Sequence, residues 1–460
     1  MQRLALSAVL LAVLAPLVVI AQNSYPIVLV NGFTGWGRDE LGGVKYWGGL
    51  QGDIQEQLKA AGYSVYTASV GPFSSDWDRA CELYAIIKGG QVDYGEKHST
   101  KYGHNRYGRN FTGLYPQWGE EVDGAVNKIH LIGHSMGGQT SRMLAQMLQK
   151  GTKGAPVEEA ASSHPLFAGG KDWVHSITTI STPNQGTTLA DGISEIGDFI
   201  KTLLLGLLSV IDIAGTDVET VYDVKLDQWN ISARGEDESI SDYVDRFFSS
   251  NIFDPGFVDI CLYDLSREGA KVESTWIETL DNVYYYSYAT IDSFSTIDWL
   301  WRKISLPNFL TMLFILDPFS VFVGSRYALT GLDHLAVIGF TLLKDVYDIY
   351  EAQAQLLASL PADSSSSSRR TLADSTTSAP PDGLAALANA SVTSAVSSLV
   401  AAATSVQTAD DLTALCAATS TSLAATYCAK MLNITIAADA LATSAAISVA
   451  NATSTRHLRG

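Results

Sequence analysis

One stretch of the chain restricts the possible folds more than any other, because it joins a buried strand to a helix through a glycine-flanked serine. This stretch, KIHLIGHSMGGQTSRMLAQMLQKG, runs from Lys128 to Gly151. Its first part is a short apolar run typical of a strand, and apolar residues between Met143 and Leu148 then recur at helical spacing. The Gly-His-Ser-Met-Gly sequence between them is typical of a nucleophile elbow, a sharp turn at the end of a strand in an α/β fold.

The serine of this turn, Ser135, is the candidate nucleophile. The turn lifts its side chain clear of the sheet, and the small residues two positions before and after it let the strand and helix backbones approach each other. Ser135 also lies at the positive end of the helix, where the backbone N–H of Met136 can stabilise an oxyanion. The alternative is a buried serine in an ordinary strand-to-helix turn, but the flanking strand and helix favour the nucleophile.

The amino-terminal segment has the features of a signal peptide. Residues 1–21 contain one early cation, Arg3, followed by an apolar run that ends in the small-residue pattern of a cleavage site at Ala21. An uncleaved membrane anchor is the alternative, but the run is close to the ~18-residue lower limit for a span and leads directly into domain sequence. We therefore expect a secreted, extracellular protein with no stable membrane span.

The acidic composition excludes one class of partner. The 460 residues carry a formal net charge of −18, and nearly all of it lies between Asn23 and Pro361. Nucleic-acid binding needs a basic footprint, so we expect no nucleic-acid partner.

Residues 22–361 read as one α/β domain. A buried strand at Tyr25–Val30 is followed by a helix at Asp53–Ala61 and a second strand at Tyr63–Val70, and this order indicates a parallel sheet. Further along, the sequence predicts a helix at residues 78–88, strands at residues 173–180 and 282–290, and a closing helix at residues 342–360; Gln91 to Asn110 is a polar stretch with no clear period.

One apolar segment, Asp198–Ile213 (DFIKTLLLGLLSVIDI), is too apolar for an exposed helix and too short to cross a bilayer. Its position after the helix of Ser135 suits a lid over the site, and a core helix is the alternative.

Residues 362–460 form a different kind of region, an Ala/Ser/Thr-rich tail that we expect to be largely disordered. Glycosylation sequons begin at five asparagines, two in the domain and three in the tail: Asn110, Asn230, Asn389, Asn433 and Asn451.

Four cysteines in a secreted chain suggest disulfide bonds. The most economical of the three possible pairings joins Cys81 to Cys261 in the domain and Cys416 to Cys428 in the tail.

From Tyr25 to about Pro361 the chain resembles the thermoalkalophilic bacterial lipases and their staphylococcal relatives. The shared stretches are PIVLVNGFTGWGRDE, KYWGG, SSDWDRACE, GHSMGGQT, VYDVKLDQW, YDLS and LDHLAVIG. The resemblance implies an α/β-hydrolase fold with a helical lid and hydrolysis of carboxylic esters, especially triacylglycerols. It does not extend into the tail.

The other catalytic groups follow from chain order and from the family. In α/β hydrolases the loop after the early strand supplies a second oxyanion donor, here the N–H of Phe33, and the base follows the nucleophile. Among the histidines after Ser135, His457 lies in the tail and His164 and His175 precede the lid segment. This leaves His334, which also lies in the family's Asp-His-Leu context.

The resemblance also implies a zinc site near the lid. Its two aspartates and two histidines are matched by Asp78, His98, His104 and Asp259, and these residue types suit a closed tetrahedral zinc centre. The family's calcium site follows the base, where this chain has Ala336 and Thr341, so we expect no calcium there.

The family's catalytic acid has no clear counterpart in this chain. The family's aspartate lies in an Asn-Asp-Gly-Ile-Val type of turn, and no such string occurs between Thr290 and His334. Asp292 and Asp317 are weak substitutes, and a deleted segment is the main explanation.

Two functions remain open. The first is a secreted lipase that acts on lipid or ester substrates at an oil–water interface, with an esterase for short soluble esters as a lesser variant. The second is a catalytically impaired lipid-binding or structural protein that keeps the fold and the zinc site.

Overall fold

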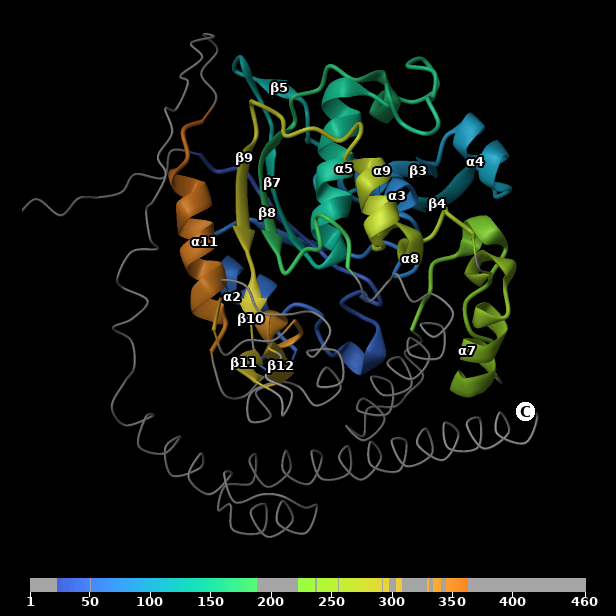
Figure 1. Ribbon diagram of the computed structural model, residues 1–460. Helices are drawn as coiled ribbons and strands as arrows, with labels where there is room; N and C mark the ends of the chain where they lie inside the picture. Colours follow the sequence, from blue (N-terminus) through green and yellow to red (C-terminus); the bar gives the residue numbers. More distant parts are fainter. Residues whose placement is uncertain are drawn as a thin grey trace, which may run out of the picture.

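The chain is organised around a parallel β-sheet. The structure is a computed structural model, and it describes residues 23–49, 51–187, 222–235, 238–254, 256–291, 293–297, 303–307, 329–330, 334–340 and 345–362. The sheet has five strands in the order β2-β1-β7-β8-β9, and every neighbouring pair is parallel (Figure 1). Its strands are β1 (Ile27–Val30), β2 (Val65–Ala68), β7 (Ile129–His134), β8 (Val174–Ile180) and β9 (Tyr284–Tyr288). The predicted α/β fold is confirmed.

Both faces of the sheet are buried, which explains the uninterrupted apolar strands. Successive residues of a strand point to opposite faces, so Ile27 and Leu29 belong to one hydrophobic cluster while Val28 and Val30 belong to another. Helices α2 (Ile54–Ala60) and α11 (Tyr347–Ser359) cover the first face, and α3 (Asp76–Lys88) and α5 (Met136–Lys150) cover the second (Figure 1).

Side-chain caps determine where two of these helices begin. Asp53 accepts a hydrogen bond from the backbone N–H of Glu56 at 3.2 Å, and α2 starts at the next residue. Ser75 accepts one from the N–H of Asp78 at 3.3 Å, so α3 begins at Asp76, two residues before the predicted start.

The polar stretch from Gln91 to Asn110 is more regular than its sequence indicated. It contains most of a small antiparallel sheet, β3 (Gly90–Asp93) and β4 (Tyr107–Phe111), with helix α4 (Glu96–Tyr102) between the strands. This unit of β3, α4 and β4, here called the α4 unit, packs beside α3 and carries both histidines of the predicted zinc site.

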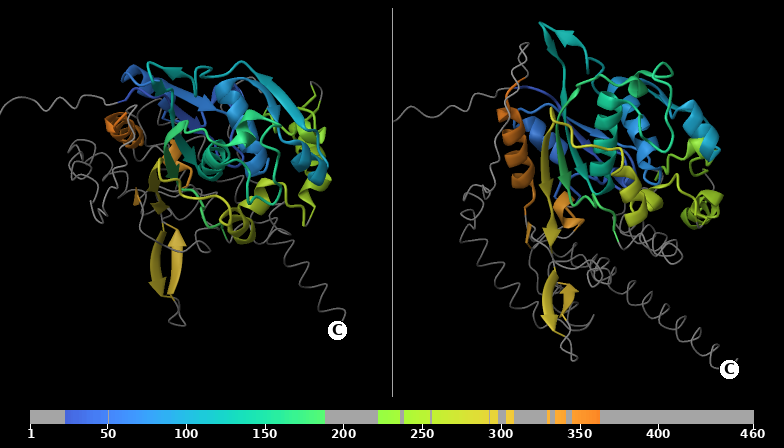
Figure 2. Two further views of the ribbon diagram at one scale, coloured as in Figure 1. Left: turned by 90° about the horizontal axis from the view of Figure 1, so that it is seen from above. Right: turned by 45° about the horizontal axis from the view of Figure 1, so that its top comes forward.

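The segment after the sheet's fourth strand contains short helices. These are η3 (Asp227–Trp229), α7 (Ile240–Phe248), η4 (Asn251–Phe253), α8 (Cys261–Asp264) and α9 (Arg267–Glu273), while η1 (Leu41–Gly43), η2 (Pro165–Ala168) and η6 (Ala336–Ile338) lie elsewhere in the chain. Three two-stranded sheets complete the structure: β5 (Glu121–Val122) with β6 (Ala125–Val126), β10 (Thr290–Ile291) with β13 (Leu329–Thr330), and β11 (Ser293–Ile297) with β12 (Lys303–Pro307). The β11–β12 hairpin extends away from the central sheet (Figure 2).

Several predicted regions lie outside the described residues. These are the signal peptide at residues 1–21, the lid segment Asp198–Ile213, the Cys416–Cys428 pair and all of the tail beyond residue 362. Across the part of the chain that is described, no helix has the length and apolar character needed to cross a bilayer.

Candidate functional site

The predicted nucleophile lies at a strained turn between β7 and α5. Ser135 has φ 54° and ψ −130°, a backbone conformation that non-glycine residues adopt only where the surrounding structure imposes it. The flanking glycines allow this turn, since a Cβ at Gly133 would lie 2.3 Å from the carbonyl oxygen of Gly137. A Cβ at Gly137 would lie 2.3 Å from the carbonyl oxygen of Val30. The local geometry is that of a nucleophile elbow.

One candidate oxyanion donor, Met136, directly follows Ser135, and the other, Phe33, lies in the loop after β1. The loop after β1 approaches Ser135 so closely that a Cβ at Gly32 would be 2.7 Å from the Ser135 Cβ. The N–H groups of Gly32 and Thr34 are both hydrogen-bonded. Within the described residues, those of Phe33 and Met136 have no acceptor. Two free N–H groups near one serine can stabilise a negative oxygen.

A hydrogen-bond relay joins this loop to the predicted base. Nε2 of His134 lies 2.8 Å from the backbone oxygen of His334, which can only accept, so Nε2 carries the proton. Nδ1 of His134 is therefore an acceptor, and the hydroxyl of Tyr46 donates to it at 2.6 Å. The same hydroxyl accepts from the N–H of Gly32 at 2.9 Å. Burial lowers the pKa of His134 well below its usual value, which keeps the imidazole neutral.

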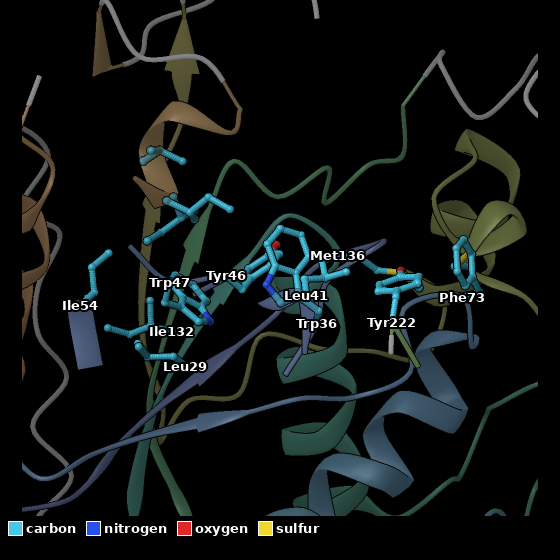
Figure 3. Close-up of a cluster of buried hydrophobic side chains, with 14 of the residues drawn as sticks. Leu29, Trp36, Leu41, Tyr46, Trp47, Ile54, Phe73, Ile132, Met136 and Tyr222 are labelled. Atoms are coloured by element: carbon cyan, nitrogen blue, oxygen red, sulfur yellow. The ribbon is translucent and has the colours of Figure 1, made fainter. Parts of the chain in front are cut away.

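Hydrophobic core residues pack against this relay. Figure 3 shows Trp36, Leu41 and Tyr46 gathered beside Met136 at the start of α5. The ring of Tyr46 packs edge-on against Trp36, with 5.2 Å between the ring centroids. The loop after β1 and the start of α5 therefore pack against the same apolar side chains.

His334 is placed next to the elbow. Its ring lies 4.6 Å from that of His134, the residue directly before Ser135. Within the described residues Ser135 and His334 are linked through His134 and not by a direct hydrogen bond. Burial lowers the pKa of His334 to about 4. The acid candidates Asp292 and Asp317 lie outside the described residues.

The four predicted zinc ligands converge. Asp78, His98, His104 and Asp259, here called the metal cluster, each offer one ligand atom, and these atoms lie within 4.8 Å of one another. Nε2 of His98 is 3.3 Å from Oδ1 of Asp78 and 3.2 Å from Oδ1 of Asp259, and Nε2 of His104 is 3.4 Å from Oδ2 of Asp259. The residues come from α3, α4, the loop before β4 and the loop before α8.

Among the described residues, one buried polar atom on each member of the metal cluster has no hydrogen-bond partner. These atoms are Oδ1 of Asp78, Nε2 of His98, Nε2 of His104 and Oδ2 of Asp259. Four such atoms facing one another are costly unless something binds them, and two imidazole nitrogens with two carboxylate oxygens make a good donor set for a divalent metal ion.

Neighbouring residues hold these ligands in orientation. Nδ1 of His104 lies 2.9 Å from the backbone oxygen of Asn105, which leaves the lone pair on Nε2. Gln228 donates to Oδ2 of Asp78 at 2.9 Å, and the ring of His98 stacks on Trp77 with 4.7 Å between centroids.

The electrostatics of the metal cluster show how strongly it favours positive charge. Burial lowers the pKa of His98, but the carboxylates of Asp259 and Asp78 outweigh it and raise the pKa to about 9. Burial also opposes the charged form of Asp259, yet the two histidines hold the pKa of that carboxyl below its usual value.

The predicted Cys81–Cys261 disulfide is wrong. Both cysteines are buried free thiols. Cys81 packs in the cluster under α3 and α5, whereas Cys261 packs in the cluster on the other face, so their proximity in sequence to Asp78 and Asp259 does not bring the sulfurs together.

Sequence reasoning missed two sets of residues. One is the relay through Tyr46 and His134, and the other is a group of three carboxylates, Asp76, Asp264 and Glu273. A signal was present for some of them, because Tyr46 lies in KYWGG, His134 in GHSMGGQT, Asp76 in SSDWDRACE and Asp264 in YDLS.

The fold and the site define the class of protein: an α/β protein with a parallel sheet, a nucleophile elbow and an Asp/His metal cluster. Comparison with known proteins specifies it further: residues 23–317 match the family model described as "Lipase-like, C-terminal domain". The chain belongs to this family, which confirms the resemblance to the staphylococcal lipases.

Individual relatives support the assignment to this family. The chain is 39% identical over 280 residues to a lipase of Staphylococcus hyicus, an alignment that covers 60% of this chain and 42% of that protein, so the chain spans less than half of its length. Among solved structures, lipase 1 from Pelosinus fermentans matches with a TM-score of 0.63 at 41% identity, covering 74% of this chain and 99% of that one. EstA from Clostridium botulinum matches with a TM-score of 0.64 at 37% identity, covering 75% and 90%.

Proposed function

We propose that this chain is a secreted serine hydrolase of carboxylic esters, a lipase that acts on triacylglycerols at an oil–water interface. The observation that carries the proposal is the strained backbone of Ser135, next to a loop whose Phe33 N–H, like that of Met136, has no acceptor within the described residues. Such strain persists where function needs it. The lipase relatives support the same reaction class.

In this proposal the chemistry proceeds in two halves. The Ser135 hydroxyl attacks the ester carbonyl while Nε2 of His334 takes its proton, and the N–H groups of Phe33 and Met136 hold the oxyanion. The imidazolium then protonates the departing alcohol, which leaves an acyl-serine. Water, deprotonated by the same imidazole, releases the fatty acid and restores the serine.

The surroundings suit an apolar acyl chain. Phe33 packs edge-on against Phe73 with 5.7 Å between ring centroids, and Phe73 in turn contacts the phenylalanines of α7 and η4. The lid role of Asp198–Ile213 and the extracellular location belong to the same proposal. So does the absence of a nucleic-acid partner, which rests on the net charge of −18.

We assign Zn²⁺ to the metal cluster, with Asp78, His98, His104 and Asp259 as its ligands. Four protein ligands complete a tetrahedral shell and leave no position for a substrate, so the ion would be structural. It would join α3, the α4 unit and the loop before α8.

The experiment is active-site labelling of the full chain with an alkyl organophosphonate, followed by peptide mapping. The expected result is one adduct on Ser135 that also abolishes hydrolysis of emulsified esters, and no adduct in Ser135→Ala. Labelling of another serine, or undiminished hydrolysis by Ser135→Ala, would disprove the mechanism. A series of acyl-chain lengths separates a lipase from an esterase.

One observation favours the second candidate, a catalytically impaired lipid-binding protein. The Asn-Asp-Gly-Ile-Val type of turn that carries the family's catalytic aspartate does not occur between Thr290 and His334. A serine hydrolase whose base lacks its orienting acid loses on the order of 10⁴ in turnover. Stoichiometric lipid binding together with turnover lower by about that factor would support this candidate over the lipase.

A further inference from the structure

A second group of acidic side chains lies near the metal cluster and has no role in the proposed reaction. Asp76 opens α3, Asp264 ends α8 and Glu273 ends α9. One carboxylate oxygen from each lies within 4.8 Å of the other two. We call these three residues the carboxylate cluster. Asp76 is fully buried, Asp264 is 8% exposed and Glu273 is half-buried.

Hydrogen bonds satisfy only part of the carboxylate cluster. Oδ1 of Asp76 accepts from the Thr140 hydroxyl at 2.5 Å, and Oδ2 of Asp264 accepts from the N–H of Asp76 at 2.6 Å. Oδ2 of Asp76 and Oε1 of Glu273 are buried and have no donor within the described residues. Unpartnered carboxylate oxygens at such depth are costly unless a cation or a proton neutralises them.

The nearby arginine supplies only part of the positive charge. Nε of Arg79 is 4.0 Å from Oδ1 of Asp76, the oxygen that Thr140 already satisfies. The N–H groups of Arg79 donate to Thr140 and to the backbone oxygens of Gly71 and Asn31. The charge of Arg142 also acts on Glu273, but two guanidinium groups face three carboxylates.

A cavity gives access to the carboxylate cluster. It has a volume of about 210 Å³, and Asp264 and Glu273 line it together with Trp276. The side chains of His98 and Asp259 line another part of the same cavity, so it borders the metal cluster as well. The volume has room for an ion and several water ligands.

We propose that the carboxylate cluster is a second cation site, separate from the metal cluster, that binds a hard divalent cation of the Ca²⁺ type through oxygen ligands. Two oxygens that both bind Ca²⁺ at about 2.4 Å are at most about 4.8 Å apart, and the three oxygens of the cluster lie within that limit. Histidine is absent from the cluster, and an all-oxygen set favours Ca²⁺ over Zn²⁺. Through Thr140, the bound ion would connect α3, α8 and α9 to the helix of the nucleophile.

The test uses the full chain loaded with zinc, so that the metal cluster is filled. Tb³⁺ is the probe because it prefers oxygen ligands as Ca²⁺ does, and its luminescence is sensitised by a nearby tryptophan such as Trp276. We expect a saturable signal that Ca²⁺ displaces, and a Tm that rises with Ca²⁺. Glu273→Gln should weaken Tb³⁺ binding by at least about tenfold and abolish the Tm rise.

Glu268→Gln is the matched control, because it removes an exposed carboxylate from the same helix and should leave binding unchanged. A Glu273→Gln protein that binds Tb³⁺ like the wild type would overturn the proposal. So would a signal lost in Asp259→Asn and kept in both Glu273→Gln and Asp264→Asn, because the ion would then lie in the metal cluster. The absence of any Ca²⁺-displaceable signal from the folded protein would also overturn it and point to a proton shared between Asp76 and Glu273. None of these readouts depends on ester hydrolysis.

Discussion

Replacing Tyr46 by phenylalanine removes one oxygen from the centre of the relay. The Tyr46 hydroxyl is buried, accepts from the Gly32 N–H at 2.9 Å and donates to Nδ1 of His134 at 2.6 Å. Phenylalanine keeps the packing against Trp36 but leaves both polar groups without a partner. Each unsatisfied buried group costs about 1–3 kcal/mol, and because the two share one atom we expect a total loss of about 2–4 kcal/mol.

The measurement is urea denaturation of Tyr46→Phe, with the free energy of unfolding extrapolated to water. Tyr350→Phe is the control, because Tyr350 is buried in the same hydrophobic cluster but its hydroxyl makes one hydrogen bond, to the carbonyl oxygen of Val337 at 2.9 Å. Its loss should cost about 1 kcal/mol. If Tyr46→Phe is no more destabilising than Tyr350→Phe, the hydroxyl does not bridge two groups and the relay is wrong. We also expect Tyr46→Phe to lower kcat, because the relay supports the Phe33 loop and the backbone of His334.

Three further predictions concern the base, the turn and the metal. Burial lowers the pKa of His334 to about 4, so the imidazole remains a neutral base in mild acid. The value of kcat/KM for a soluble ester should therefore stay level from pH 8 to about pH 5. An inflection near the ordinary histidine pKa of about 6.5 would reveal a carboxylate partner. The folded pKa lies below the unfolded value, so the stability that His334 contributes is complete above about pH 6.5 and declines as the pH falls towards 4. Gly133→Ala places a methyl group 2.3 Å from the Gly137 carbonyl oxygen and should cost at least about 1–3 kcal/mol in a denaturation curve, whereas Gly235→Ala, with its nearest neighbour atom at 3.7 Å, should stay within about 0.5 kcal/mol. His98→Ala should lower Tm by roughly 3 °C, equivalent to a loss of about 2 kcal/mol in a domain of this size, and a chelator should then have little further effect; equal chelator sensitivity in both proteins would show that His98 is not a ligand.

The sheet was predictable because its strands carry a local signal. Ile27 to Val30 are all apolar, and both faces of that strand are buried, so composition alone identifies it. The capping residues Asp53 and Ser75 are also local signals. The α4 unit was missed because its polar residues follow no apolar period, and its structure depends on the pairing of β3 with β4 and on the contacts of both strands with α3.

Parts of the site were predictable from a contiguous motif, from chain order or, for the metal cluster, from the family resemblance. Ser135 and Met136 follow from five consecutive residues, and His334 follows from chain order. The meeting of Tyr46 with His134 is a contact between distant segments that no spacing in the sequence encodes. The Cys81–Cys261 prediction failed for a related reason, since nearness to two ligands of one metal does not say which way a neighbouring side chain points.

The order of the metal cluster along the chain bears on how the protein is made. All four of its residues precede β9, and His334 comes later still. An ion that binds them closes the chain between α3 and the loop before α8 and removes conformational freedom from the unfolded state. On a ribosome, this closure becomes possible before the base is synthesised. A nascent chain could therefore acquire its metal before it can acquire a catalytic pair, and metal content would be a poor measure of how much of the enzyme has been completed.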